Sequence, residues 1–264
     1  DNSHLPAGIS LFSRPQFEWL TAGMLASQAQ GKRWRLLVNQ TWLTSDLSRW
    51  ARYPEERRHL FEFLRGTNDA AQRVHNNIVV SGDMHGNWGA DLVEKEFSGY
   101  RSGGIAPNTQ NGSTPENIAA GFYRNSTANT ANENARQGSV GIEFAPTSMG
   151  RGGFDEIIAN GQPSSSTAEQ IAASRGIESS LLATTPWCQF VEWVDHGYGI
   201  VHLTSESATF EYWWQDKLTP GAPDVLGNQM IAFAADDTSR TPPRYRNQLD
   251  HVSLPKITPE RGQR

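Results

Sequence analysis

Hydrophobic residues follow two alternating patterns between residues 13 and 81, one typical of helices and one typical of buried strands. The spacing of apolar residues predicts helices over 13–31 and 54–64. Short apolar runs predict strands over 34–38 and 77–81. Because helices and strands alternate, we expect an α/β fold in which helices cover a buried sheet.

The middle of the chain shows a different pattern. Residues 101–137 are rich in Asn, Ser, Thr and Gly and hold few large apolar residues, which predicts a surface insertion. A further strand is expected over 139–144. A helix is expected over 166–182, where Ser166 and Glu169 have the spacing of a capping box.

Three aromatic, strand-like runs follow, at 187–194, 200–204 and 208–214. The glycines at 197–199 are expected to turn the first run into the second, which gives an antiparallel β-meander. Residues 217–264 are rich in Pro, Asp and Arg, and we expect them to form an irregular tail.

Composition narrows the class of protein. The chain has 264 residues, enough for one large or two small domains. Its 23 basic and 28 acidic residues give a net charge of −5, which argues against a nucleic-acid-binding surface. No apolar run approaches the ~20 residues of a transmembrane segment. The single cysteine, Cys188, excludes an intrachain disulfide and a four-cysteine zinc site.

The candidate chemistry begins where the predicted strand 77–81 ends. A glycine follows, and then Asp83 and His85, two residues apart. Ligands of open α/β sheets bind at the carboxyl ends of strands, and a carboxylate with an imidazole suits iron, manganese or zinc. The alternative is that Asp83 only caps a turn and His85 is a polar loop residue.

The segment around this motif, residues 76–92 (NNIVVSGDMHGNWGADL), resembles the PhoD-like alkaline phosphatases, a branch of the calcineurin-like metallophosphoesterases. Other similar segments, in the same order as in the family, are 17–41, 53–57, 141–144 with 147–148, and 197–198 with 213–214. The resemblance implies an α/β fold that is part of a metallophosphoesterase-type layered β-sandwich, flanked by helices and ending in the antiparallel β-meander. Residues 1–216 are then expected to be the carboxyl-terminal part of the phosphatase domain.

The resemblance also implies a metal site. Asp83 and His85 match late metal ligands of the family, one for each of two ions. By resemblance the two or more metal ions are iron and calcium, with zinc, manganese or magnesium as other possibilities. The family's earlier metal motifs, Gly-Asp-x-x-Tyr and Asp-Asp-His-Glu, are absent from this sequence, and Cys188 does not replace its amino-terminal cysteine ligand. We therefore expect an amino-terminal segment or a partner chain to complete the domain.

Three further residues are candidates for binding the substrate. Asn39 follows a strand, but it could equally be a turn residue that satisfies nearby backbone groups. Arg151 lies in a glycine-rich loop and could bind a phosphate oxygen, although a solvated loop arginine is the simpler interpretation. His196 could border the pocket, or it could be an exposed turn residue.

The function that these features indicate is hydrolysis of a phosphate ester by a metal-activated hydroxide, outside the cytoplasm as is usual in the family. The ester could be a monoester or a diester. One alternative is a non-catalytic fragment or interaction module with a relic metal motif. Another is an extracellular sugar-binding protein, which only the aromatic strands favour.

Overall fold

The computed structural model describes residues 11–44, 50, 53–66, 74–92, 140–161, 166–184, 188–216, 219, 221–234 and 249–252. The described helices are α1 (Arg14–Ala29), α2 (Pro54–Arg65), α6 (Phe154–Gly161) and α7 (Thr167–Thr184). The described strands are β1 (Arg35–Asn39), β2 (Asn77–Ser81), β3 (Asn87–Asp91), β4 (Ile142–Ala145), β5 (Cys188–Glu192), β6 (His196–Leu203), β7 (Ser207–Gln215), β8 (Val225–Phe233) and β9 (Leu249–Val252). The expected insertion over 101–137 lies outside the described residues.

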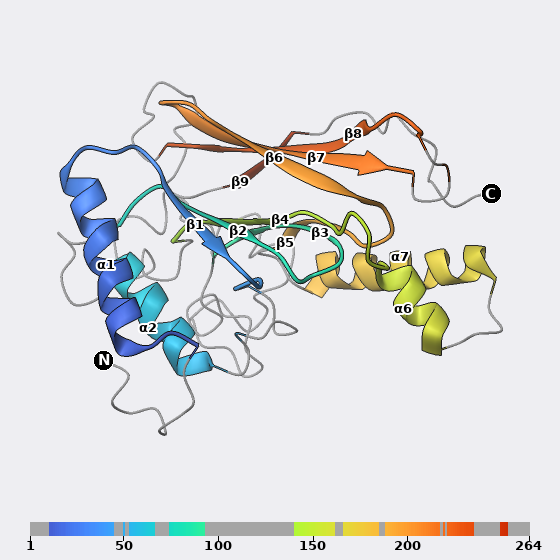
Figure 1. Cartoon of the computed structure of the whole chain (residues 1–264), viewed down its shortest axis with the longest axis horizontal. Helices are drawn as coiled ribbons and strands as arrows, with labels where there is room; N and C mark the ends of the chain where they lie inside the picture. Colours follow the sequence, from blue (N-terminus) through green and yellow to red (C-terminus); the bar gives the residue numbers. More distant parts are fainter. Residues whose placement is uncertain are drawn as a thin grey trace.

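The strands form two sheets. The first is mixed and has the order β1-β2-β4-β3-β5, with β1, β2 and β4 parallel and with β3 antiparallel to both of its neighbours. The second is antiparallel and has the order β6-β7-β8-β9. Figure 1 shows the two sheets stacked, with the helices on the opposite face of the first sheet. This layered α/β arrangement, with its closing meander, confirms the expected fold class.

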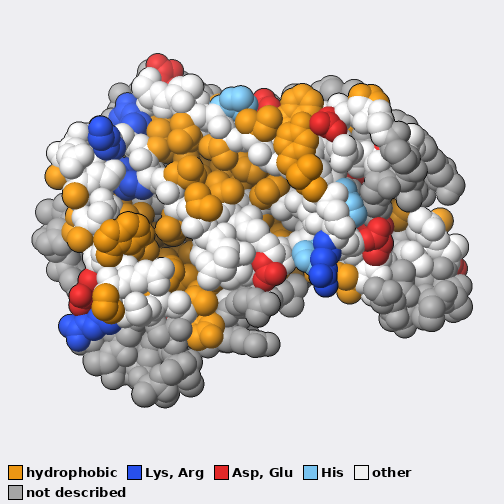
Figure 2. All heavy atoms as spheres, in the orientation of Figure 1, with side chains coloured by type: hydrophobic (Ala, Val, Ile, Leu, Met, Phe, Trp, Pro, Cys, Tyr) orange, Lys and Arg blue, Asp and Glu red, His pale blue; other side chains and the backbone are white. Residues whose placement is uncertain are grey.

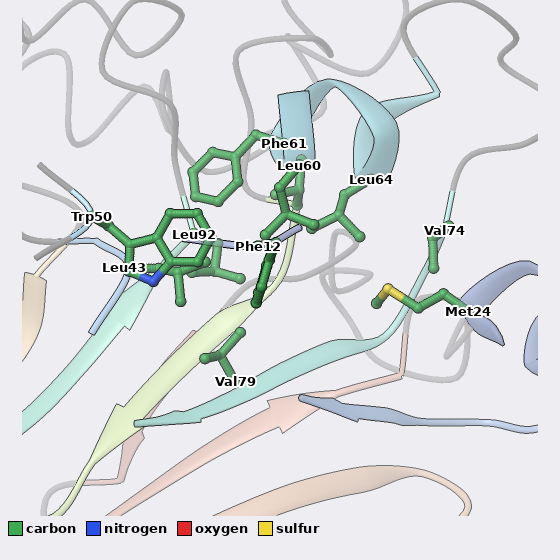
Figure 3. Packing of buried hydrophobic residues seen from close by; sticks show 11 residues of the cluster. Phe12, Met24, Leu43, Trp50, Leu60, Phe61, Leu64, Val74, Val79 and Leu92 are labelled. Carbon is green, nitrogen blue, oxygen red and sulfur yellow. The ribbon is translucent and has the colours of Figure 1, made fainter. Parts of the chain in front are cut away.

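Buried side chains fill the spaces between the layers. Between the sheets, the rings of Phe144 and Phe210 stack with their centroids 4.6 Å apart. On the other face, Met24 of α1 and Leu60 of α2 belong to the same cluster as Val79 of β2 (Figure 3). Burial on both faces explains the continuous apolar run Ile78–Val80 in the middle of β2.

Local signals place the helix ends. The hydroxyl of Ser13 accepts a hydrogen bond from the backbone N–H of Gln16 at the start of α1. Before α7, the backbone N–H of Ser166 donates to Glu169 Oε2 at 2.6 Å, and the Glu169 N–H donates back to Ser166 Oγ at 3.3 Å. This reciprocal pair is the capping box that the sequence indicates.

The end of the chain differs from the expectation in two ways. The run over 187–194 does not begin the meander, because its strand β5 pairs with β3 in the first sheet. The residues at 197–199 are not a turn but lie inside β6.

The tail expected over 217–264 is not irregular throughout, since it contributes β8 and β9 to the second sheet. Met230 and Ala232 of β8 are buried against the first sheet, and this burial outweighs the polar average of the segment. Within the described part of the chain, no helix is long and apolar enough to span a membrane.

Candidate metal centre

The carboxyl ends of four strands meet at one edge of the five-stranded sheet. The parallel strands β1, β2 and β4 end at Asn39, Ser81 and Ala145. β5 runs in the same direction, because β3 is antiparallel to both β4 and β5, and it ends at Glu192. Since ligands of open α/β sheets bind outside the carboxyl ends of strands, the segments that leave these residues are candidates for a site.

Asp83 and His85 lie on the loop 82–86, which joins β2 to β3 across the end of β4. Both have a left-handed backbone, with φ of 67° and 57°, while Met84 between them is buried in a core cluster. Such a conformation costs a non-glycine residue on the order of 1–3 kcal/mol and persists where the surroundings impose it, commonly at functional sites. The strain at both candidate ligands therefore supports a functional role for the loop.

A hydrogen bond orients the imidazole of His85. Its Nδ1 lies 3.2 Å from the carbonyl oxygen of Gly152. A carbonyl oxygen can only accept, so Nδ1 carries the proton, and in the neutral imidazole Nε2 then has the free lone pair. A metal-binding histidine has this arrangement, in which the second ring nitrogen donates to a carbonyl or carboxylate.

The three expected substrate-binding residues all lie near this edge, but in different environments. Asn39 is buried opposite Ser81 in the strand register, and its amide donates to the carbonyl of Thr41. Arg151 is exposed and directly precedes Gly152, whose carbonyl orients the candidate ligand. His196 begins β6 and is buried, with its Nε2 3.9 Å from Glu156 of α6. The imidazole of His196 therefore contacts helix α6.

Sequence reasoning missed a second group of polar residues at the same edge. The side chain of Asn87 is fully buried, donates to Glu192 Oε2 at 2.8 Å and accepts from the Thr147 N–H at 3.1 Å. The hydroxyl of Thr147 is buried without a hydrogen-bond partner among the described residues. The Asn that follows Gly86 in the motif was the available signal, but its partners lie 60 and 105 residues away.

Arg175 of α7 binds the acidic groups at the end of β5. Its guanidinium lies 2.8 Å from Glu178, 2.9 Å from Glu192 and 3.9 Å from Asp195. Burial alone would lower the pKa of Arg175, but the negative charges of Glu192 and Glu178 outweigh it and raise the pKa above its ordinary value. For the Glu178 carboxyl burial acts in the opposite direction and raises the pKa, and the contact with Arg175 opposes that shift. The ion pairs between Arg175 and these acidic residues thus fix the turn between β5 and β6.

The described residues provide part of a metal-ligand set. Asp83 offers a carboxylate and His85 an oriented imidazole, which fits a transition metal such as iron, manganese or zinc. Among the residues that the structure describes, however, no group of three or more His, Cys, Asp and Glu side chains could hold a metal ion. Cys188 is buried, and burial raises the pKa of its thiol well above the ordinary value, which disfavours the thiolate that a metal requires.

Comparison with known proteins decides the family. The family model of the PhoD-like phosphatases matches residues 4–212. The chain belongs to the PhoD-like phosphatase family. A solved structure of PhoD has a similar fold, with a TM-score of 0.56 and 17% sequence identity over 96% of this chain. The chain spans only 37% of the length of that PhoD chain. No curated protein matches the sequence.

Proposed function

We propose that this chain is the carboxyl-terminal part of a metal-dependent phosphoesterase, in which Asp83 and His85 bind metal ions. The observation that carries the proposal is the loop 82–86, where both side chains sit on strained backbone and the imidazole is oriented by Gly152. Membership of the PhoD-like phosphatase family supports hydrolysis of a phosphate ester. The metals we propose are iron and calcium, with zinc, manganese or magnesium as other possibilities.

The residues of the chain have distinct proposed tasks. Bound metal ions supply a hydroxide at neutral pH and neutralise charge on the phosphate. Asp83 provides a carboxylate oxygen, and His85 provides Nε2. We propose that the guanidinium of Arg151, an exposed residue, donates two hydrogen bonds to phosphate oxygens. Asn39, buried beside the end of β2, and His196, buried against α6, are the other two proposed substrate-binding residues.

We propose that a further segment of the parent protein, or a partner chain, completes the metal-ligand set next to β1. Leu36 and Val38 of β1 lie on the face of the sheet that packs against the second sheet, because they pair with Ile78 and Val80 of β2. They are nevertheless 46% and 76% exposed. Figure 2 shows hydrophobic side chains gathered on the side of the molecule turned toward the viewer, in the area where Figure 1 draws β1 and β6. An exposed apolar edge strand of this kind is a template for pairing with another segment.

The other proposed properties follow the family. The substrate is a phosphate monoester or diester, and the protein acts outside the cytoplasm. The sugar-binding alternative has less support, because the aromatic residues on one side of β7, namely Phe210, Tyr212 and Trp214, are buried. They belong to the interior of the protein and are not a surface for a sugar ring.

The experiment is to measure metal content and hydrolysis of p-nitrophenyl phosphate and bis(p-nitrophenyl) phosphate in the full-length protein. Asp83→Asn and His85→Ala are each expected to lower kcat/KM by roughly 100-fold or more and to lower the amount of bound metal. The matched controls are Asp224→Asn, at an exposed aspartate, and His202→Ala, at a histidine whose side chain is 55% exposed. Both controls should stay within about twofold of the parent.

Unchanged turnover in the Asp83 and His85 variants would contradict the site. Metal binding without hydrolysis of either ester would favour the non-catalytic module. Binding of glycans without any metal would favour the sugar-binding alternative.

A further inference from the structure

A buried carboxylate beneath the loop 82–86 has no task in the proposed reaction. Glu143 of β4 is 0% exposed. Its Oε1 accepts from the Ser81 hydroxyl at 2.5 Å and from the Leu43 N–H at 2.6 Å. Its Oε2 accepts from the N–H and the hydroxyl of Thr44, at 3.0 and 2.5 Å. Such a group is expensive to bury, so its four donors indicate a specific role.

Hydrogen bonds connect Glu143 to both ends of the loop, directly through Ser81 and indirectly through Thr44 and Trp88. Ser81 is the last residue of β2 and directly precedes residues 82–86. On the other side, the indole N–H of Trp88 in β3 donates to Thr44 Oγ1 at 2.8 Å. The Thr44 hydroxyl accepts from Trp88, so it directs its own hydrogen at Glu143. One carboxylate thereby links the residue before the loop with the strand after it.

The same carboxylate also holds the segment that follows β1. The backbone N–H groups of Leu43 and Thr44 point at its two oxygens. This segment continues from Asn39, which pairs with Ser81 at the carboxyl edge. The segments that leave β1 and β2 therefore share one acceptor.

We propose that Glu143 is a positioning residue, whose carboxylate fixes the loop 82–86 and the segment 43–44 relative to each other. The left-handed conformations of Asp83 and His85 need surroundings that impose them, and the links through Ser81 and Trp88 supply that constraint at both ends of the loop. That fixing the loop also favours metal binding rests on the proposed function, whereas the structural role of Glu143 is independent of that function.

Only a carboxylate offers acceptors at all four positions. In Glu143→Gln, one oxygen becomes an amide NH₂ group that donates and does not accept. Wherever that NH₂ group lies, it faces the backbone N–H of either Leu43 or Thr44, and a backbone N–H cannot rotate away. The variant has nearly the same volume as glutamate but loses at least one of these links, so it tests the hydrogen bonds rather than the packing.

The experiment measures amide hydrogen exchange in the full-length protein and in three variants. Glu143→Gln is expected to raise exchange about tenfold or more at both 43–44 and 82–88, with protection in β6 to β8 unchanged. Ser81→Ala removes only one donor and is expected to raise exchange over 82–88 but not over 43–44. The control Glu206→Gln, at an exposed glutamate in the turn between β6 and β7, should change neither segment.

Unchanged protection of both segments in Glu143→Gln, or a uniform loss over the whole protein, would overturn the proposal. If Glu143→Gln fails to fold, Ser81→Ala decides: a rise confined to 82–88 supports the proposal, and no rise there overturns it. Mn²⁺ titration of the same variants separates the two proposals. A 10–100-fold weaker affinity in Glu143→Gln is expected where Mn²⁺ binds the parent. Absence of Mn²⁺ binding in the parent counts against the proposed metal site, and the exchange data still decide the role of Glu143.

Discussion

The two edge strands of the five-stranded sheet, β5 and β1, differ in how the rest of the chain covers them; they are called the β5 end and the β1 end here. At the β5 end, Glu192 receives Arg175, Asn87 and the N–H groups of the following turn, and α7 packs alongside. At the β1 end, Leu36 and Val38 point toward the space between the sheets and remain exposed. The first end is closed by this chain itself, whereas the second presents an apolar edge.

The candidate ligands lie between these two ends. The loop of Asp83 and His85 leaves β2, which neighbours the open strand β1, and enters β3, which neighbours the closed strand β5. The closed side provides the rigid support, through Asn87 and Gly152. In the proposed function, the additional ligands come from the open side. In the proposed function, the site is therefore supported from the β5 side and completed from the β1 side.

The largest expected effect tests the closed end. Replacing Arg175 with Met removes the cation from between Glu178 and Glu192, which stay buried. Breaking a buried ion pair by removing one partner costs about 3–5 kcal/mol of the free energy of unfolding. Urea unfolding measures the free energy of unfolding of Arg175→Met and of the parent. Arg14→Met is the control, because the Arg14–Glu18 pair is exposed and contributes about 0–1 kcal/mol. A loss below about 1 kcal/mol in Arg175→Met would show that the network does not hold the β5 end.

A smaller effect separates a covered strand from the open one. Val79 of β2 is 2% exposed and Val38 of β1 is 76% exposed. Val79→Ala should lower the free energy of unfolding by about 2–3 kcal/mol, because it removes two buried methyl groups and leaves a cavity. Val38→Ala should cost about 0.5 kcal/mol or less in the 264-residue chain.

Thermal and urea unfolding of both valine variants, repeated with the longer parent protein, makes the test sharper. If another segment covers β1 there, the cost of Val38→Ala should rise toward that of Val79→Ala. An equally small cost in both proteins would mean that the edge stays open.

The parts of the fold that the sequence predicts are those with local signals. The caps at Ser13 and Ser166 place the starts of α1 and α7, and the strand expected over 77–81 is β2. The glycines at 197–199 misled because their reason is not local. A Cβ on Gly197 would lie 1.8 Å from the Trp213 carbonyl oxygen, and one on Gly199 would lie 2.1 Å from the Phe210 ring. These glycines allow β7 to approach β6 closely, and they do not form a turn.

The candidate site shows the same division. Asp83 and His85 are adjacent to a strand end and can be found from the order of residues alone. The groups that hold them, such as Gly152 and Glu143, come from segments about 60 residues further along the chain. No periodicity or capping pattern marks a contact over that distance, because only the folded sheet brings its strand ends together.

The last expected effect is a dependence of stability on pH, which compares two glutamates. Burial raises the pKa of Glu143 above its ordinary value, so the folded state binds its proton more tightly than the unfolded state. Its stabilising contribution is present at low pH and is lost as the pH rises through the folded-state pKa. The free energy of unfolding of the parent relative to Glu143→Gln should therefore fall with rising pH above about 4.5, by at most about 1.4 kcal/mol per pH unit.

Glu169 provides the opposite case. The hydrogen bonds from the Ser166 N–H and hydroxyl lower its pKa, so its contribution is present at neutral pH and is lost as the pH falls through the folded-state value. Relative to Glu169→Gln, the parent should become less stable toward acid, with the opposite slope from the Glu143 comparison. Urea unfolding between about pH 3 and pH 7 measures both slopes. Slopes of the same sign would mean that the four hydrogen bonds to Glu143 outweigh the effect of its burial on the pKa. The buried carboxylate in the middle of the sheet would then be stabilised as fully as the acidic groups at the β5 end.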